Sequence, residues 1–91
     1  MKRKQIEENL KKQGFNKFLI KINIIYKDNS TQLLESELML KAKIKDISEM
    51  QCCEIALETI LACADKHNID IYDIYDYSTE LQQLKGGETV D

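Results

Sequence analysis

The chain has 91 residues, of which 43% are hydrophobic and 32% charged, and its formal net charge is −3. This is the composition of one small globular domain and excludes a disordered chain. No apolar run approaches the roughly 20 residues that span a bilayer, and no apolar core follows the basic start, so neither a membrane helix nor a secretory signal is predicted. We expect a cytoplasmic protein with no membrane partner.

Charge is divided unevenly along the chain. Residues 1–27 carry eight Lys or Arg against two Glu, a net of +6, whereas residues 46–91 carry eleven Asp or Glu against two Lys, a net of −9. The segment between them is neutral, with three charges of each sign. A surface divided in this way favours electrostatic recognition of a partner over chemistry on a substrate.

Residues 2–13 are predicted to form a short helix whose apolar stripe consists of Ile6 and Leu10. Gly14 follows as a left-handed stop, which lets Phe15 pack back on Leu10. Three basic residues in the first turn oppose the helix dipole, so we expect this end to fray or to be held by an anionic group.

The next two elements are predicted to form an antiparallel β-hairpin. Residues 16–27 alternate with period two, which indicates a strand with one buried face, and residues 28–30 supply a turn. The alternation over 34–44 indicates a second strand, although residues 30–37 also fit a helical turn. Lys side chains of the first strand and Glu side chains of the second are expected to pair on the exposed face. The inward face is expected to hold Phe18, Ile20, Ile22, Ile24, Tyr26, Leu34, Ser36, Leu38, Leu40, Ala42 and Ile44.

A longer helix is predicted over residues 46–66, with Asp46 at its N-cap, Glu49 at the capping-box position and Asn68 as its left-handed stop. Its apolar arc is too wide for a two-stranded sheet to cover, so a further element or a second copy must lie against it. The arc consists of Met50, Cys53, Ala56, Leu57, Ile60, Leu61 and Ala64.

The last predicted element is a helix over residues 71–85, with Asp70 at its N-cap and a hydrophobic staple between Ile69 and Ile74. As a strand, the same residues place Asp on both faces, which is the poorer fit. A glycine pair ends this helix, and residues 86–91 are expected to form a loose tail.

These elements predict one α+β domain over residues 1–91 with the order α-β-β-α-α, in which helices pack on an antiparallel hairpin. A two-stranded hairpin is marginal alone, and both of its edges are open. We therefore expect a homodimer that completes the sheet, unless the helix over 71–85 covers the free side of the longer helix.

The sequence carries no recognisable catalytic or metal-binding motif. His67 is the only histidine and shares a helix face with Cys63, but apolar packing explains the cysteine and helix capping explains the histidine. Zinc-ligand spacing and a Gly-rich phosphate loop are both missing, and the acidic residues after position 69 lack the spacing of a calcium loop. We expect no enzymatic activity, no metal and no cofactor.

The main functional hypothesis concerns the Tyr- and Asp-rich segment 69–77. Carboxylates spaced beside tyrosines imitate a run of phosphates and suit a basic nucleic-acid channel, and tyrosine is a common interface anchor. The simpler alternative is an amphipathic helix whose Asp residues favour its first turn and keep the protein in solution. The residues expected to contact a basic partner protein are Asp70, Tyr72, Asp73, Tyr75, Asp76 and Glu80.

A second hypothesis is a nucleic-acid-associated regulator that uses the basic N-terminal helix and the Lys face of the first strand. A single arginine, the lack of an exposed aromatic platform on that strand face and the acidic net charge stand against it. The residues expected to contact nucleic acid in this alternative are Lys2, Arg3, Lys4, Lys11 and Lys12.

In general arrangement the chain is similar to small acidic phage-encoded inhibitors of bacterial defence nucleases, including some anti-CRISPR proteins. The likeness rests on length, acidity, a short sheet with helices and the Tyr/Asp-rich segment, and no motif carries it. It implies a non-catalytic regulatory or inhibitory protein that engages a basic, nucleic-acid-handling partner.

Overall fold

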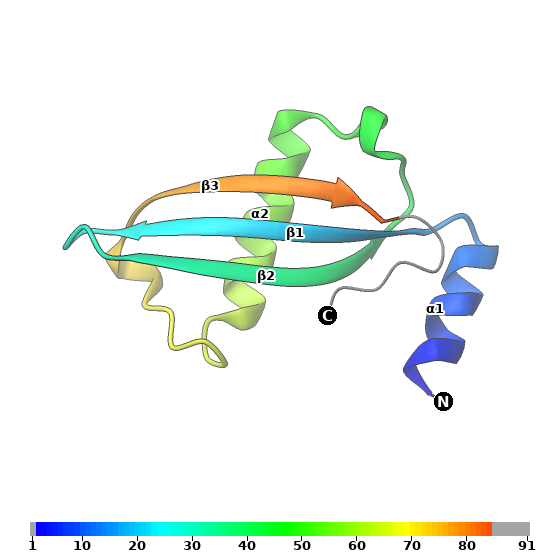
Figure 1. Cartoon of the computed structure of the whole chain (residues 1–91), viewed down its shortest axis with the longest axis horizontal. Coiled ribbons are helices and arrows are strands. Elements are labelled where there is room, and N and C mark those ends of the chain that lie inside the picture. The colour runs from blue at the N-terminus through cyan, green and yellow to red at the C-terminus, as the bar shows by residue number, and fades with distance from the viewer. Residues whose placement is uncertain (1, 85–91) are drawn as a thin grey trace.

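Residues 2–84, which the computed structural model describes, form two α-helices, three strands and two short 3₁₀ turns (Figure 1). The fold is α+β, as predicted, but the order of the main elements is α-β-β-α-β, because the last one is a strand. The elements are α1 (Arg3–Lys12), β1 (Asn16–Tyr26), β2 (Thr31–Leu40), η1 (Ile44–Asp46), α2 (Glu49–Cys63), η2 (Ile71–Asp73) and β3 (Ile74–Gln83).

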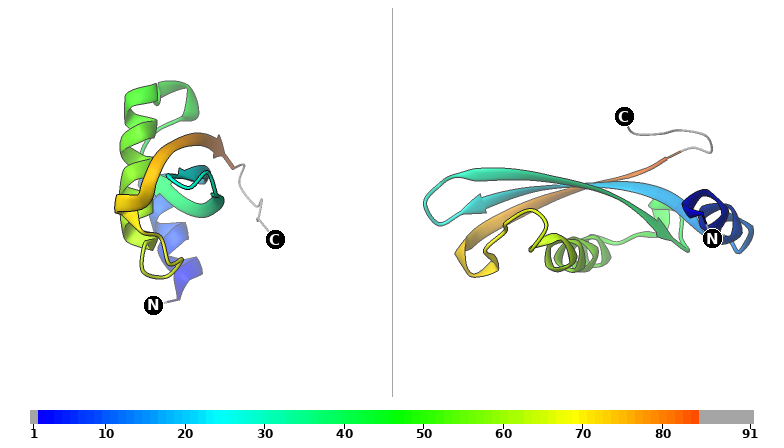
Figure 2. Two further views of the ribbon diagram at one scale, coloured as in Figure 1. Left: turned by 90° about the vertical axis from the view of Figure 1, so that its left-hand side faces the viewer. Right: turned by 90° about the horizontal axis from the view of Figure 1, so that it is seen from below.

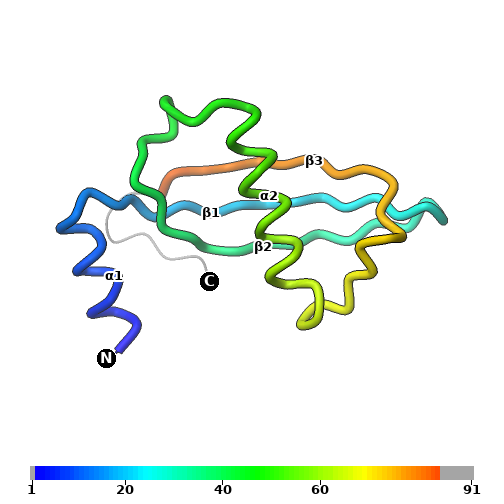
Figure 3. The backbone as a smooth tube through the Cα atoms, turned by 180° about the vertical axis from the view of Figure 1, so that it is seen from behind, coloured from blue at the N-terminus to red at the C-terminus, as the bar shows by residue number. Residues whose placement is uncertain are grey.

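The strand order in the sheet is β2-β1-β3, and the central strand β1 runs antiparallel to both neighbours. β2 and β3 are therefore parallel to each other on opposite sides of β1, and α2 connects them across one face of the sheet (Figure 3). The predicted hairpin is confirmed, with Phe18 opposite Leu38 and Ile22 opposite Leu34. Residues 31–40 settle the ambiguous segment as strand, which ends at Leu40 rather than at the predicted position 44.

The core lies between α2 and the face of the sheet formed by the even-numbered residues of β1. The right-hand view of Figure 2 shows α2 end-on beneath this face, and none of the helices of residues 2–84 covers the opposite face. Phe18, Ile20, Ile22 and Ile24 are completely buried, as the alternation predicted. Burying one such side chain stabilises the fold by about 1.5–3 kcal/mol. The core cluster consists of Ile20, Ile22, Ile24, Leu34, Ala56, Ile60 and Ile69.

α1 ends as predicted but contributes no buried residue. Gly14 adopts a φ of 94°, and the backbone N–H groups of Gly14 and Phe15 donate to the carbonyls of Lys11 and Leu10 at 3.1 and 3.0 Å. These two hydrogen bonds form the Schellman motif, in which a left-handed residue suits glycine best. The motif turns the chain from α1 directly into β1.

α2 begins two residues later than the predicted capping box would place it. Ser48, not Asp46, is the N-cap: its Oγ accepts the Gln51 backbone N–H at 3.2 Å, while the Gln51 side chain accepts the Ser48 N–H at 2.9 Å. Asp46 instead ends the 3₁₀ turn η1. α2 ends at Cys63 rather than at the predicted position 66, with Ala64 as its C-cap. Asn68 does have a left-handed φ of 55°, but it lies in the turn that follows, where Ile69 donates its N–H to the Ala64 carbonyl at 2.8 Å.

Only part of the predicted apolar arc of α2 meets the sheet. Ala56 and Ile60 are buried, whereas Met50, Leu57 and Leu61 are exposed. The helix crosses the strands, so one flank of it stays uncovered (Figures 2 and 3). The predicted second helix does not cover that flank, since its residues belong to the sheet.

Residues 74–83 form the strand β3 rather than part of a helix over 71–85. Ile74, Tyr75, Tyr77 and Thr79 are four of its ten residues, and side chains of these types favour strands. From Tyr77 onward the pattern is period two, with Tyr77 and Leu81 packed on the core and Ser78 and Glu80 exposed. Residues 77–83 therefore alternate as a strand does, with Tyr77 as the first inward residue of the regular pattern.

A β-bulge explains why the strand pattern was hidden. Ile25 pairs with Asp76 and Tyr26 pairs with Ile74, so Tyr75 is an extra residue in β3. The extra residue shifts the alternation by one position, which makes Asp appear on both faces when the sequence is read continuously. Asp70 does cap a turn, because its Oδ1 accepts the Tyr72 N–H at 3.1 Å, but that turn is the short η2.

Two sequence-based expectations concern segments at the margins of the fold. The predicted tail over 86–91 and the predicted helix end at position 85 lie outside the described residues. Within residues 2–84, no helix combines the length and the apolar character that crossing a membrane requires.

Candidate functional site

An apolar groove of about 360 Å³ lies between α2 and β3. α2 contributes Leu57 and Leu61, which are 48% and 60% exposed, and the other wall contains Tyr75, which is 75% exposed. Large apolar side chains gathered on one exposed face are typical of an interaction site. The groove is lined by Leu57, Ile60, Leu61, Ile71, Ile74, Tyr75, Asp76 and Tyr77.

The six residues predicted to contact a partner do not form one ridge. Tyr75 and Asp76 line the groove, whereas Glu80 pairs with Lys21 in the register of β1 and β3 and is exposed. Tyr72, which is 83% exposed, belongs to the turn η2. The other two, Asp70 and Asp73, are exposed at the ends of that turn.

The free edge of β3 borders this groove. The Leu84 N–H donates to the Lys17 carbonyl at 2.8 Å, which fixes the alternation of hydrogen bonds between β1 and β3. In an antiparallel pair, residues of the alternate positions direct N–H and C=O away from the neighbouring strand. Tyr77, Thr79 and Leu81 occupy these outward positions, and no fourth strand pairs with them within residues 2–84.

A carboxylate occupies one position on this edge. The Asp76 Oδ1 accepts the outward N–H of Tyr77 at 2.8 Å. A charged side chain at an exposed edge opposes pairing with another strand. Thr79 and Leu81 have no comparable side-chain acceptor among the described contacts. The edge is therefore open at these two residues, between Asp76 and Gln83, whose side-chain Oε1 accepts the backbone N–H of the η1 residue Ile44 at 2.9 Å.

The elements around the groove are strongly acidic. Residues 49–83 carry eight Asp or Glu against Lys66, a net of −7. Burial raises the pKa of Tyr26, and the negative charges of Asp70 and Asp73 raise it further. Asp76 is the one carboxylate of the groove lining, and an exposed apolar groove in so acidic a part of the chain complements a basic surface.

The alternative nucleic-acid residues lie at the other end of the molecule, on α1 (Figure 1). Lys2, Lys4, Lys11 and Lys12 are exposed there. The connection after β2 approaches the same end, since the Lys41 Cε would lie 3.9 Å from a Cβ placed on Gly14. The basic helix α1 and the turn η2 with Asp70 and Asp73 thus lie toward opposite ends of a molecule that measures 44 Å along its longest axis (Figure 1).

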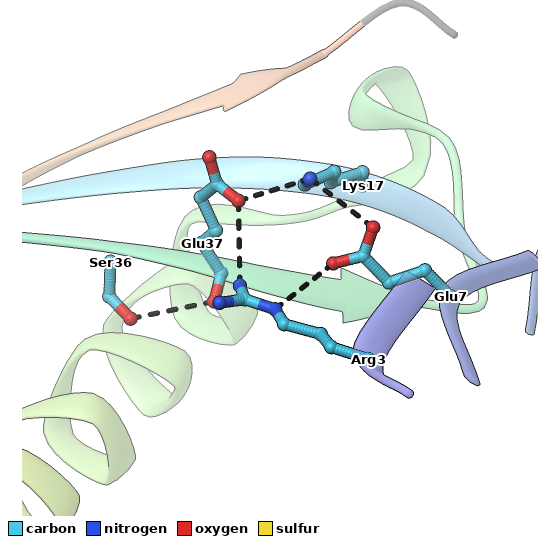
Figure 4. A network of polar contacts seen from close by, with 5 residues as sticks. All are labelled: Arg3, Glu7, Lys17, Ser36 and Glu37. Carbon is cyan, nitrogen blue, oxygen red and sulfur yellow. Dashed lines mark hydrogen bonds and ion pairs between the residues drawn. The ribbon is translucent and has the colours of Figure 1, made fainter. Parts of the chain in front are cut away.

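Arg3, the fifth of these residues, belongs to a network that joins α1 to the sheet (Figure 4). Lys17 Nζ lies 3.1 Å from Glu37 Oε2 and 3.4 Å from Glu7 Oε2, while Arg3 lies 3.2 Å from Glu7 and 3.7 Å from Glu37. The predicted pairing of Lys and Glu across the hairpin is confirmed for Lys17 and Glu37. Glu7 of α1 and Glu37 of β2 supply the anionic groups that pair with Arg3 at the basic end of α1.

The pKa values in this network follow the contacts. Burial works to raise the pKa of Glu7, but the charge of Lys17 and hydrogen bonds from Lys17 and Arg3 outweigh it and hold that pKa below its usual value. The hydrogen bond to Glu37 raises the pKa of Lys17 against the opposing effect of burial. Both shifts favour the charged forms that attach α1.

The cysteines and the histidine show no catalytic arrangement within residues 2–84. Burial raises the pKa of the Cys52 thiol, which disfavours the thiolate that a nucleophile requires. The backbone N–H of His67 donates to the backbone carbonyl of Cys63 at 3.0 Å, in the turn that follows α2. Among the described residues, no three His, Cys, Asp or Glu side chains lie close enough together to hold a metal ion.

Sequence reasoning missed the groove itself. The signal was present in the excess apolar arc of α2, which was expected to need a cover, and in the tyrosines of segment 69–77. The missing step was the strand assignment of β3, which places Tyr75 beside Leu57 and Leu61. No protein-family model, curated protein or solved structure gives a significant match to this chain.

Proposed function

We propose that this protein is a non-catalytic, regulatory binding module that engages a basic partner protein at the acid-rimmed groove between α2 and β3. The observation that supports the proposal is the exposure of Tyr75 and Leu61 beside an apolar groove in a part of the chain with a net charge of −7. Aromatic anchors inside a polar rim are the usual composition of a protein interface.

The negative charge around the groove defines the class of partner. A surface rich in Lys or Arg gains favourable long-range electrostatics here, and a protein that handles nucleic acid carries such a surface. Occupying that surface would exclude the partner's own nucleic acid. The proposed regulatory effect is therefore inhibition, which is also what the likeness in length and acidity to small phage-encoded inhibitors suggests.

The homodimer expected from the sequence also remains a proposal. Self-pairing through β3 brings together the acidic residues of two copies, because this strand contains Asp76 and Glu80 and no Lys or Arg. The edge of β2 is the better site for a second copy, since Arg3 and Lys17 pair with the Glu37 carboxylate on that strand. The Leu33 side chain lies on β2 and is 60% exposed. Sedimentation equilibrium tests this arrangement by comparing the mass of the full chain with that of the Leu33→Lys variant.

A second candidate function uses the opposite end of the molecule. The exposed Lys side chains of α1 and the approach of Lys41 to Gly14 gather positive charge where the chain could contact a phosphate backbone. In this alternative the protein is a nucleic-acid-associated regulator. A salt-dependent shift of DNA or RNA that disappears when Lys2, Arg3, Lys4, Lys11 and Lys12 are neutralised would support it.

Capture from a bacterial lysate, eluted with a salt gradient and analysed for protein and nucleic acid, separates these candidates. The acidic groove predicts a basic protein that is released by modest salt and is lost from the variant Asp73→Lys/Asp76→Lys. The matched control is Glu8→Lys/Glu35→Lys, which changes the net charge equally at exposed positions on α1 and β2. Retention of the protein by Asp73→Lys/Asp76→Lys would contradict the proposed function, and nucleic acid eluting alone would favour the basic end.

A further inference from the structure

Resting on the proposed function, we propose that the partner contributes an extended segment that adds to β3 as a fourth strand and whose side chains alternate between apolar and basic. Thr79 and Leu81 present their N–H and C=O groups along the free edge, and the groove adjoins that edge at Tyr77, two residues before Thr79. Strand addition of this kind takes affinity from main-chain hydrogen bonds and specificity from alternate side chains.

The two faces of β3 dictate the alternation. On the α2 side, an added strand meets the apolar groove that contains Leu57, Leu61 and Tyr75. On the opposite side, the β3 residues are Ser78, Glu80 and Gln82, together with Asp76, which is opposite Ile25. Because successive side chains of a strand point to opposite faces, the incoming segment needs apolar residues toward α2 and Lys or Arg toward these carboxylates.

The charge of the edge selects this occupant over a second copy. β3 carries two carboxylates and no cation, and α2 beside it is acidic as well, so a second β3 offers nothing that neutralises them. The Asp76 carboxylate also covers the outward N–H of Tyr77. An incoming Lys or Arg gives that carboxylate a new partner, which frees the N–H for the added strand.

The test uses the full chain and two synthetic peptides of equal length and charge. The strand probe is an eight-residue peptide of alternating Lys and Val with blocked ends, and the helix probe places Lys and Leu at helical spacing. We expect the strand probe to bind and to slow hydrogen exchange of the Thr79 and Leu81 amides by about tenfold or more, because exchange requires those amides to open. The amides of Leu33 and Glu35 on the β2 edge should not change.

A proline variant tests the same edge by mutation. Thr79→Pro removes an outward N–H and leaves the β1–β3 hydrogen bonds in place, since proline is tolerated where its nitrogen faces solvent. We expect it to weaken binding of the strand probe about tenfold, whereas Leu33→Pro, at an outward position on β2, changes binding less than about twofold. Thermal melting checks that both variants fold. If Thr79→Pro does not fold, the hydrogen-exchange experiment on the unmodified chain tests the proposal instead.

The outcomes separate the strand proposal from the proposed function. If the probes bind with no protection of Thr79 and Leu81, and Asp73→Lys/Asp76→Lys abolishes that binding, strand addition is wrong and the acidic groove stands. If neither probe binds and lysate capture recovers no basic protein, both proposals fail. Protection of Thr79 that increases with protein concentration and without peptide identifies a second copy as the occupant and overturns the proposal.

Discussion

Lys17 Nζ lies 3.1 Å from Glu37 Oε2, and this contact joins β1 to β2 at the same point where Glu7 joins α1 to the sheet. Lys17 is only 15% exposed, so its ammonium group depends on the two carboxylates for compensation. α1 buries no side chain of its own. Its position therefore depends on this network more than on apolar packing.

Lys17→Met should detach α1 while the sheet remains folded. Glu7 and Glu37 then keep only the exposed Arg3 as a shared cation, and we expect the free energy of unfolding to fall by about 1 kcal/mol. Loss of helical ellipticity together with faster hydrogen exchange in α1 measures the effect. Lys21→Met is the control, because Lys21 lies on the same face without an ion pair among the described residues, and equal effects of the two variants would contradict the role of the network.

Attachment of α1 should depend on pH through Glu7. Because the folded-state pKa of Glu7 is depressed, its contribution is present above its ordinary value of 4.5 and is lost as the pH falls through the lower folded value. The raised pKa of Lys17 has the opposite sense, so its contribution is present below 10.5 and is lost at more alkaline pH.

NMR signals of the Ile6 methyl groups, followed by titration, report the attachment of α1. We expect the acid-induced change to disappear in Glu7→Gln and to persist in Glu8→Gln, since Glu8 is exposed and belongs to no ion pair in the described network. An unchanged titration in Glu7→Gln would assign the effect to another group.

Gly14→Ala should destabilise the turn between α1 and β1. At a φ of 94° an L side chain is strained whatever the available space, and the nearest atom to an added Cβ is the flexible end of Lys41 at 3.9 Å. We expect a loss of about 1 kcal/mol from backbone strain, measured by urea unfolding. Gln13→Ala, one residue earlier and in an ordinary conformation, should change stability less than Gly14→Ala does.

Asp76→Ala should make the β3 edge more prone to pair with a strand of another molecule. Removing the carboxylate frees the Tyr77 N–H and reduces the acidic charge of the edge, which are two features that oppose strand pairing. We expect concentration-dependent association, detected by light scattering, at protein concentrations where the unmodified chain does not associate. Asp76→Asn retains an acceptor for the Tyr77 N–H, so its association should be stronger than that of the unmodified chain and weaker than that of Asp76→Ala. Identical association of Asp76→Asn and Asp76→Ala would assign the effect to charge alone.

Neighbouring residues of α2 should separate stability from binding. Ile60 is 2% exposed in the core, so Ile60→Ala should lower the free energy of unfolding by about 2–5 kcal/mol. Leu61 lies in the exposed groove wall, so Leu61→Ala should change stability by less than about 0.5 kcal/mol while weakening peptide or partner binding. Urea unfolding and calorimetric titration measure the two effects, and undiminished binding by Leu61→Ala would remove the groove from the interface.

The hairpin and its inward face could be predicted because residues such as Phe18, Ile22 and Leu34 alternate without interruption. The stop at Gly14 was equally clear, since its chemistry is local. β3 could not be predicted in the same way, because the extra Tyr75 interrupts the alternation and a regular period no longer fits. The helix assignment then followed from the spacing of the Asp residues, which suits several conformations.

Two residues of the groove were among those predicted to contact a partner, but its shape and most of its lining were not predicted. Tyr75 and Asp76 were identified from their chemistry, and both line the groove. Leu57 and Leu61 were assigned to an arc that needed a cover, because the sequence does not reveal how α2 crosses the sheet. The open edge at Thr79 depends on pairing between distant segments, which residue patterns do not specify.

The central position of β1 has a consequence for the order in which the protein can fold during synthesis. β1 pairs with β2 across a short turn, but its other side waits for β3, whose residue Gln83 pairs with Phe18. Contacts between such distant segments form late because loop closure must precede them. Until β3 is made, the nascent hairpin exposes Ile20, Ile22 and Ile24 beside an unpaired edge, so this interval is when the chain has most need of a chaperone.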